Sequence, residues 1–244
     1  MKTYVVGNLK GGVGKTTTTV NLAYSLSLLN QKILVVDCDP QCNTTVFFSK
    51  VNAKGVTIKQ IFENPEKIKT YKTKYANIDL VKGFPEVTVY SETALNEALA
   101  HVKDRYDICL IDSRPVFDDL TKNAVYAADV LLTPIKFDNF CRDNLALVED
   151  AYHEFAEVNP NLEWYVFANM VARAKAQKIA SEDLIARHAY PVLDTCISRS
   201  AVVDNALSLY KPVAKHRRDS IVASDFMELA TELLALPNGG DSNE

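Results

Sequence analysis

The chain of 244 residues carries a formal net charge of −4, with 48% hydrophobic and 24% charged residues. This composition is typical of a soluble globular protein with one domain, and it excludes a protein whose whole surface is basic. No apolar run approaches the roughly 20 residues of a membrane-spanning helix, and the first residues lack the pattern of a secretion signal. The five cysteines form no C-x-x-C pair, so we expect free thiols and a cytoplasmic protein.

Short apolar runs without alternation are typical of strands that are covered on both faces of a parallel sheet. In chain order they lie at residues 3–7, 32–37, 107–112, 130–135 and 164–171. Two weaker runs, which we expect to form edge strands, lie at residues 77–81 and 191–197. Apolar residues at helical spacing predict helices over residues 16–29, 140–158 and 221–236. The alternation predicts an α/β fold, a doubly wound, mostly parallel sheet with helices on both faces.

A glycine-rich loop lies between the first predicted strand and the first predicted helix, in the stretch GNLKGGVGKTTTT (residues 7–19). Glycines allow successive backbone N–H groups to turn inward, and the positive end of the following helix adds to the attraction for an anion. In that arrangement Lys15 reaches the outer phosphates of a nucleotide and the Thr16 hydroxyl reaches Mg²⁺. The stretch departs from the common pattern G-x-x-x-x-G-K-[ST] at Leu9, where the first glycine would stand, and Lys10 follows.

The segment KGGVGKTT resembles the deviant Walker A motif of the ParA/MinD ATPases, K-G-G-x-G-K-[ST], in which the residue before the first lysine varies. The resemblance implies a P-loop ATPase that binds ATP and Mg²⁺ and forms a homodimer around two ATP molecules. By this match Lys10 is the signature lysine, which reaches the phosphates bound by the partner subunit. The implied nucleotide contacts in the loop are Lys10, Gly11, Gly12, Val13, Gly14, Lys15, Thr16 and Thr17.

Two acidic segments extend the resemblance. VVDCDPQCN (residues 35–43) looks like the family's D-x-D-P-Q-G-N, by which Asp39 positions the attacking water. YDICLIDSRP (residues 106–115) looks like the Walker B strand, by which Asp112 holds Mg²⁺ through water. The implied catalytic residues are therefore Lys10, Lys15 and Asp39, and the implied metal site contains Thr16, Asp39 and Asp112.

The acidic segments also depart from the family pattern at two places. Cys42 occupies the usual glycine, so the local backbone geometry is expected to differ. Ser113 and Arg114 stand where Thr-Pro or Cys-Pro is typical, and the role of Arg114 stays open between phosphate, a partner and solvent.

The resemblance continues through LTKNAVYAADVLLTPIKFDNF (residues 120–140) and DTCISRSAVVDNALSLYKPV (residues 194–213). It implies that Asn169 reads the adenine edge and that Arg199 contributes to the base pocket, although Ser198 replaces the usual proline. The matches run from residue 3 to about residue 236. We therefore expect residues 1–236 to form a single ParA-like P-loop ATPase domain and residues 237–244 to be a disordered tail.

Positive charge collects late in the chain. Residues 171–218 hold nine Lys or Arg and four acids, whereas residues 219–244 hold six acids and no base. ParA members bind DNA without sequence preference as ATP dimers, and a dimer doubles a modest basic patch whose phosphate contacts are sensitive to salt. A solvated basic face without a partner is the alternative for this patch. The candidate DNA-binding residues are Arg173, Lys175, Lys178, Lys211, Lys215, Arg217 and Arg218.

The leading hypothesis is a partition ATPase that segregates or positions a plasmid or chromosome. By the resemblance, it hydrolyses ATP to ADP and phosphate with Mg²⁺, binds DNA as the ATP dimer, associates with the nucleoid and is stimulated by a ParB-type adaptor. The alternatives are a MinD-like membrane-cycling or protein-cargo positioning ATPase and a metabolic enzyme on the same fold. We expect no membrane partner, because the last predicted helix carries Asp225, Glu228 and Glu232 on its polar side instead of the basic residues that anionic lipids attract.

Overall fold

The protein folds around one eight-stranded sheet with the strand order β3-β4-β2-β5-β1-β6-β7-β8. The computed structural model describes residues 1–49, 55–136, 141–172 and 191–237. All neighbouring strands run parallel except β3 and β4, which are antiparallel. The strands are β1 (Lys2–Val6), β2 (Ile33–Asp37), β3 (Tyr71–Lys72), β4 (Ile78–Val81), β5 (Ile108–Asp112), β6 (Val130–Ile135), β7 (Glu163–Val171) and β8 (Val192–Ser198).

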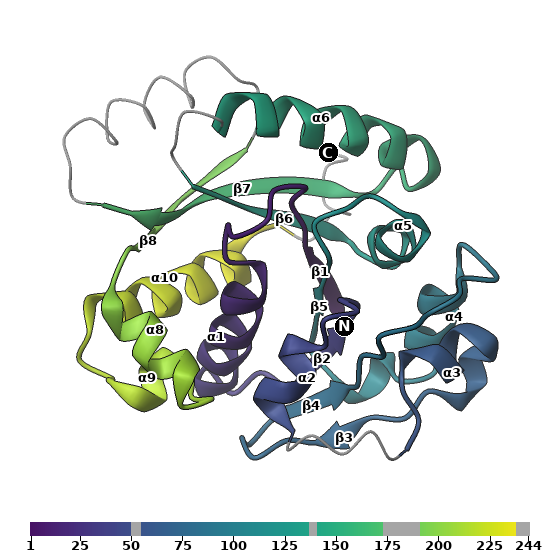
Figure 1. Cartoon of the computed structure of the whole chain (residues 1–244), viewed down its shortest axis with the longest axis horizontal. Coiled ribbons are helices and arrows are strands. Elements are labelled where there is room, and N and C mark those ends of the chain that lie inside the picture. Colours follow the sequence, from purple (N-terminus) through teal and green to yellow (C-terminus); the bar gives the residue numbers. More distant parts are fainter. Residues whose placement is uncertain (50–54, 137–140, 173–190, 238–244) are drawn as a thin grey trace.

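Helices cover both faces of this sheet (Figure 1). One buried cluster lies between the sheet and helices α1, α2 and α8 to α10, and the other lies between the sheet and helices α3 to α6. The helices on the first face are α1 (Lys15–Leu28), α2 (Asn43–Phe48), α8 (Ala201–Ser208), α9 (Val213–His216) and α10 (Ile221–Ala235). Those on the second are α3 (Ile58–Glu63), α4 (Ala94–Ala100), α5 (Asp119–Tyr126) and α6 (Cys141–Val158), with the short 3₁₀ helices η1 (Pro65–Lys67) and η2 (Lys103–Arg105).

The doubly wound α/β architecture predicted from the sequence is confirmed. Each of the seven predicted strands and three predicted helices is present, and no end moves by more than one residue. The two-residue strand β3 was not predicted, and because it pairs with β4, residues 77–81 form the second strand from the edge instead of the edge itself. Residue 140, where one helix was predicted to begin, and the tail at 238–244 lie outside the described residues.

The central strands bring the ends of several chain segments together at one edge of the sheet. β1 lies between β5 and β6, and β5 also pairs with β2. In this register Asp112 is the neighbour of Val6 on one side and of Asp37 on the other. Because all these strands are parallel, their carboxyl ends meet at the same edge, which is where ligands bind in open α/β sheets.

Buried polar side chains fasten helices and strands that are far apart in the sequence. Asn21 of α1 accepts a hydrogen bond from the backbone N–H of Val213 at 2.7 Å, and it donates to Thr17 within its own helix. Two acids of α10 serve β8 in the same way: Asp225 accepts from the Ser198 N–H at 2.7 Å, and Glu232 accepts from two further β8 amides. These bonds satisfy backbone groups that would otherwise be buried without a partner.

This arrangement corrects part of the expectation for α10. Asp225 is buried and Glu232 bonds β8, so these two acids do not form an exposed polar face. In the part of the chain that the structure describes, no helix is both long enough and apolar enough to cross a membrane.

We predict that Asn21→Ala lowers the free energy of unfolding by about 1–3 kcal/mol, because it leaves the Val213 N–H buried without an acceptor. Chemical denaturation measures this change. Asn205→Ala, at an exposed position of α8, is the matched control and should leave stability unchanged or slightly raised. Equal stability of the two variants would contradict the role given to Asn21.

Candidate functional site

The glycine loop has the backbone shape that a phosphate-binding loop requires. Gly12 and Gly14 have φ angles of 72° and 93°, a region that side-chain-bearing residues rarely adopt. Gly14 is also the N-cap residue of α1, and a Cβ atom added there would lie 2.5 Å from Nδ2 of Asn169. The loop therefore presents backbone N–H groups at the positive end of a 14-residue helix, which is an anion-binding arrangement.

Asn8, which the sequence analysis did not single out, holds the start of this loop. Its side chain is 1% exposed, donates from Nδ2 to the Pro134 carbonyl at 2.8 Å and accepts from the Lys10 N–H at 2.8 Å. The loop is thereby tied to the end of β6. A polar residue two positions after the end of the buried strand β1 was the signal that could have revealed this role.

Lys15 lies inside the loop and not in solvent. It is 7% exposed, and its Nζ donates to the carbonyls of Asn8 at 3.0 Å and of Lys10 at 3.2 Å. Burial lowers the pKa of Lys15, while the charges of Asp112 and Asp39 act in the opposite direction. An ammonium group with this placement is held ready for an anion. Lys10, by contrast, is partly exposed at the mouth of the loop.

Asp112 ends β5 as a fully buried carboxylate beside the loop. Its Oδ2 accepts hydrogen bonds from Thr16 at 2.8 Å and from Thr44 at 2.7 Å, whereas its Oδ1 is buried without a hydrogen-bond partner. Burial, with the charge of Asp37 as the next cause, raises the pKa of Asp112 to about 7. Thr44 was not predicted from the sequence, although a threonine at the start of a helix that follows an acidic motif was its signal.

The acids at the end of β2 have different environments. Asp37 is fully buried, and its carboxylate accepts from the backbone N–H groups of Thr45 at 2.7 Å and Asp39 at 3.2 Å. Burial raises the pKa of Asp37 to about 6. Asp39 is partly exposed and accepts from the Gln41 N–H at 2.9 Å. Only Asp39 of the two can therefore reach a water molecule at the surface of the site.

The structure clarifies both departures from the family pattern. Cys42 has φ 54° as the N-cap of α2, so it adopts the left-handed conformation that favours glycine at this position instead of a different local geometry. Arg114 forms an ion pair with Asp118 at 2.8 Å. This intrachain contact is an outcome that the three options for Arg114 did not include. Ser113 is buried and donates to the Val6 carbonyl.

Asn169 and Arg199, the two residues that were expected to contact the adenine base, differ in burial. Asn169 of β7 is 3% exposed and donates to the Val13 carbonyl at 2.7 Å, so it shapes the phosphate loop directly. Arg199 follows β8, is exposed, and its backbone N–H donates to the Val171 carbonyl. The roles of Asn169 and Arg199 at an adenine base stay predictions.

The basic candidates fall into two groups. Lys211, Lys215, Arg217 and Arg218 are exposed around α9, whereas Arg173, Lys175 and Lys178 lie outside the described residues. Lys74, which was not predicted, joins the first group because its Nζ donates to the Tyr210 carbonyl at 2.8 Å. Burial and then the nearby charge of Lys211 lower the pKa of Lys74. We call Lys74, Lys211, Lys215, Arg217 and Arg218 the α9 basic surface.

The site offers Mg²⁺ only a few protein ligands, which is sufficient for this ion. Across residues 1–49, 55–136, 141–172 and 191–237, no group of three or more His, Cys, Asp or Glu is arranged to hold a metal ion. Mg²⁺ usually takes one or two protein oxygens and completes its shell with water and substrate phosphates. The Thr16 hydroxyl and the unpartnered Oδ1 of Asp112 are suited to that role.

A family profile described as an AAA domain matches residues 1–164. The chromosome-partitioning ATPase Soj of Thermus thermophilus is 32% identical over 237 residues, which cover 94% of this chain and 94% of that protein. The chain belongs to the ParA/MinD family of P-loop ATPases. Membership agrees with the loop, because both lysines of the deviant motif are present on a strand-loop-helix unit, and ATP with Mg²⁺ fits the site.

Solved structures share this fold at lower identity. The septum site-determining protein MinD from Pyrococcus horikoshii, complexed with Mg-ADP, aligns with a TM-score of 0.77 at 21% identity, over 95% of each chain. Cobyrinic acid a,c-diamide synthase from Mycobacterium smegmatis, with a bound ATP analog and magnesium, aligns with a TM-score of 0.82 at 22% identity, over 96% of this chain and 94% of that chain. A septum site-determining protein and a biosynthetic protein thus share one architecture.

We predict that Asp112→Asn stabilises the protein in the absence of nucleotide and Mg²⁺. Because the pKa of Asp112 is raised in the fold, the native state binds more protons than the unfolded state as pH rises from about 4 to about 7, and wild-type stability falls over that range. At about pH 8 the variant should be more stable by on the order of 1–2 kcal/mol, and the gain should shrink toward about pH 4.

Urea denaturation across this pH range measures the effect, with Asp104→Asn as the control because Asp104 is exposed on η2. Parallel stability profiles for the wild type and Asp112→Asn would show that the buried charge at Asp112 has no energetic cost.

Proposed function

We propose that this protein is an ATP-dependent, dimerising partition ATPase that binds DNA without sequence preference and is stimulated by a ParB-type adaptor. The observation that carries the proposal is the phosphate loop with two lysines in different environments: Lys15 buried inside it and Lys10 partly exposed at its mouth. Relatives named as chromosome-partitioning proteins match over nearly the whole chain, which favours this member of the family.

The division of labour between the two lysines follows from their positions. Lys15 is bonded to carbonyls of its own loop, so it neutralises phosphate bound by the same subunit. Two ATP molecules that face each other across a dimer repel strongly at low dielectric. Lys10, at the mouth, extends toward the partner's nucleotide and offsets that repulsion only when ATP is present. Dimerisation therefore depends on the nucleotide.

The remaining residues of the site would bind Mg²⁺ and orient the attacking water. Thr16 and Asp112 would hold Mg²⁺, which neutralises charge on the phosphates when it is bound. Asp39, the accessible carboxylate of the pair at the end of β2, orients the water that attacks the terminal phosphate. The hydrogen bond from the Gln41 N–H to Oδ1 of Asp39 limits the directions in which this carboxylate can point. The adaptor raises the hydrolysis rate, and hydrolysis releases the dimer from DNA at the nucleoid.

The α9 basic surface is the proposed DNA contact within the described residues. Its five cations come from two distant parts of the chain, and Lys74 is anchored on the Tyr210 carbonyl beside Lys211. In a dimer the surface is present twice, so the number of phosphate contacts doubles. Each contact releases counterions and makes binding steeply sensitive to salt.

Two other functions on this fold receive less support. A membrane-cycling protein of the MinD type would need an apolar and basic face near the chain end, but Asp225 and Glu232 of α10 are engaged with β8. A biosynthetic enzyme shares the fold, as the cobyrinic acid a,c-diamide synthase shows at 22% identity. A small-molecule acceptor that sharply raised ATP turnover would favour that second function.

We predict that Lys10→Ala keeps ATP binding by the monomer but loses the ATP-induced dimer and retention on DNA, because Lys10 acts only across the interface. Lys15→Ala is the paired variant, and it should lose ATP binding itself because no other buried cation stands in the loop among the described residues. Light scattering with ATP, ADP or no nucleotide measures the assembly, and fluorescent-nucleotide titration measures binding. ATP-dependent dimers of Lys10→Ala would remove this lysine from the mechanism.

We predict that the single variants Lys74→Ala and Lys211→Ala both weaken ATP-dependent DNA binding. Each should reduce the slope of log K against log salt by up to about 0.9 for each phosphate contact that is lost. Fluorescence anisotropy with random-sequence duplexes measures the slope, and Lys103→Ala on η2, across the sheet, is the control. If Lys103→Ala changed the slope as much as Lys74→Ala does, the assignment of the α9 basic surface would be wrong.

A further inference from the structure

A second polar cavity lies at the edge of the sheet that is opposite to the phosphate loop. It has a volume of about 390 Å³ and is formed where β2, β4 and β5 begin, with β3 as one wall. Seven residues line it, and we call this cavity the amino-edge groove: Lys32, Thr70, Lys72, Asn77, Asp79, Arg105 and Tyr106. None of these residues belongs to the ATP site.

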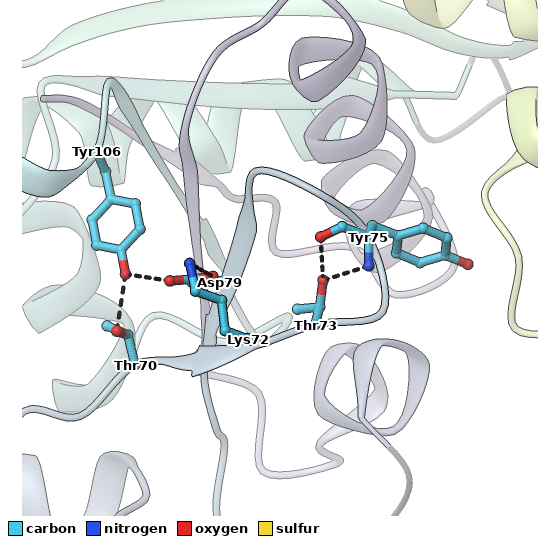
Figure 2. Close-up of polar contacts among 6 residues, drawn as sticks. All are labelled: Thr70, Lys72, Thr73, Tyr75, Asp79 and Tyr106. Carbon is cyan, nitrogen blue, oxygen red and sulfur yellow. Dashed lines mark hydrogen bonds and ion pairs between the residues drawn. The ribbon is translucent and has the colours of Figure 1, made fainter.

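The floor of the groove is a chain of hydrogen-bonding groups (Figure 2). Asp79 is 7% exposed, although its neighbours along β4 are buried apolar residues. The Tyr106 hydroxyl lies 2.8 Å from Oδ2 of Asp79 and 2.9 Å from Oγ1 of Thr70. Because a phenol has one proton, it cannot donate to both groups at once. It therefore donates to the Asp79 carboxylate and accepts from the Thr70 hydroxyl, which leaves acceptor lone pairs on Asp79 and Thr70 for a ligand.

The rim of the groove carries more positive charge than its floor can balance. Lys72 pairs with Asp79 at 3.3 Å, which accounts for the one lining carboxylate. Lys32 and Arg105 form no ion pair with any described carboxylate, and the neighbouring Asp107 uses its Oδ2 on the backbone N–H of Lys32. Lys32, Lys72 and Arg105 therefore face the carboxylates of Asp79 and the adjacent Asp107, an excess of one positive charge that favours an anion.

We propose that the amino-edge groove binds a small phosphorylated molecule that carries hydroxyl groups, of the sugar-phosphate class. Arg105 and Lys32 hold the phosphate, since guanidinium and ammonium groups are its usual partners. Asp79, Thr70 and Asn77 bond the hydroxyls. The volume lies within the range of small-molecule sites, which is about 300–1,000 Å³. Tyr106 is 8% exposed and Arg105 lies over its ring at 5.5 Å from the ring centre, so the ring offers no free face on which a nucleobase could stack.

A purely structural role predicts a different result, because the same contacts would then only fasten β3 to the sheet. Calorimetric titration of the full chain with ribose 5-phosphate distinguishes ligand binding from a purely structural role. Ribose and inorganic phosphate are titrated separately for comparison. We expect saturable binding of ribose 5-phosphate that is tighter than that of either probe. Arg105→Gln and Lys32→Gln should each weaken it by about tenfold, whereas Lys103→Gln, a cation outside the groove, should not.

The Lys15→Ala variant separates this site from the phosphate loop, and it should bind ribose 5-phosphate as the wild type does. Tyr106→Phe should reduce the preference for ribose 5-phosphate over inorganic phosphate while the protein stays folded, which a thermal melt verifies. Three results would overturn the proposal: no binding, binding that Lys15→Ala abolishes, or equal affinity for inorganic phosphate, which would mean an adventitious ion only.

Discussion

The site depends on two buried carboxylates that the register of the sheet places side by side. Asp37 and Asp112 are paired positions at the ends of β2 and β5, and each charge raises the cost of the other inside the protein. Neighbouring hydroxyl and amide donors, from Thr16, Thr44 and Thr45, offset part of that cost. The negative charge that these donors do not offset attracts cations. Lys15 neutralises part of it, and a divalent ion would neutralise more.

The phosphate loop is anchored at two points, both to strands that lie on one side of β1. Asn8 ties its beginning to the end of β6, and Asn169 ties the Val13 carbonyl to β7. The loop backbone is thus fixed by strands of the sheet and not by its own sequence alone. An anion that enters finds amide groups already oriented, so little conformational entropy remains to be lost on binding.

The sequence was sufficient for the architecture and for the loop, because strand periodicity and glycine spacing are local signals. Asn8 and Thr44 had only a weak local signal and Lys74 had none, since their roles depend on contacts with residues that are distant in the chain. β3 was missed because two residues carry no periodicity. Asp225 looked like an exposed helix residue, but a β8 amide outcompetes water for its carboxylate.

Two side chains of the β3–β4 turn end on a single carbonyl, because Lys74 and Tyr75 both donate to Tyr210. Tyr75 also packs edge-on against Tyr24 of α1 at 5.2 Å between ring centres, and α1 begins at the phosphate loop. The turn therefore connects the loop before α9, which contains Tyr210 and Lys211, to α1, the helix that follows the phosphate loop. A displacement of the Tyr210 carbonyl would therefore disturb Lys74 and Tyr75 together and, through Tyr75, the ring contact with Tyr24 of α1.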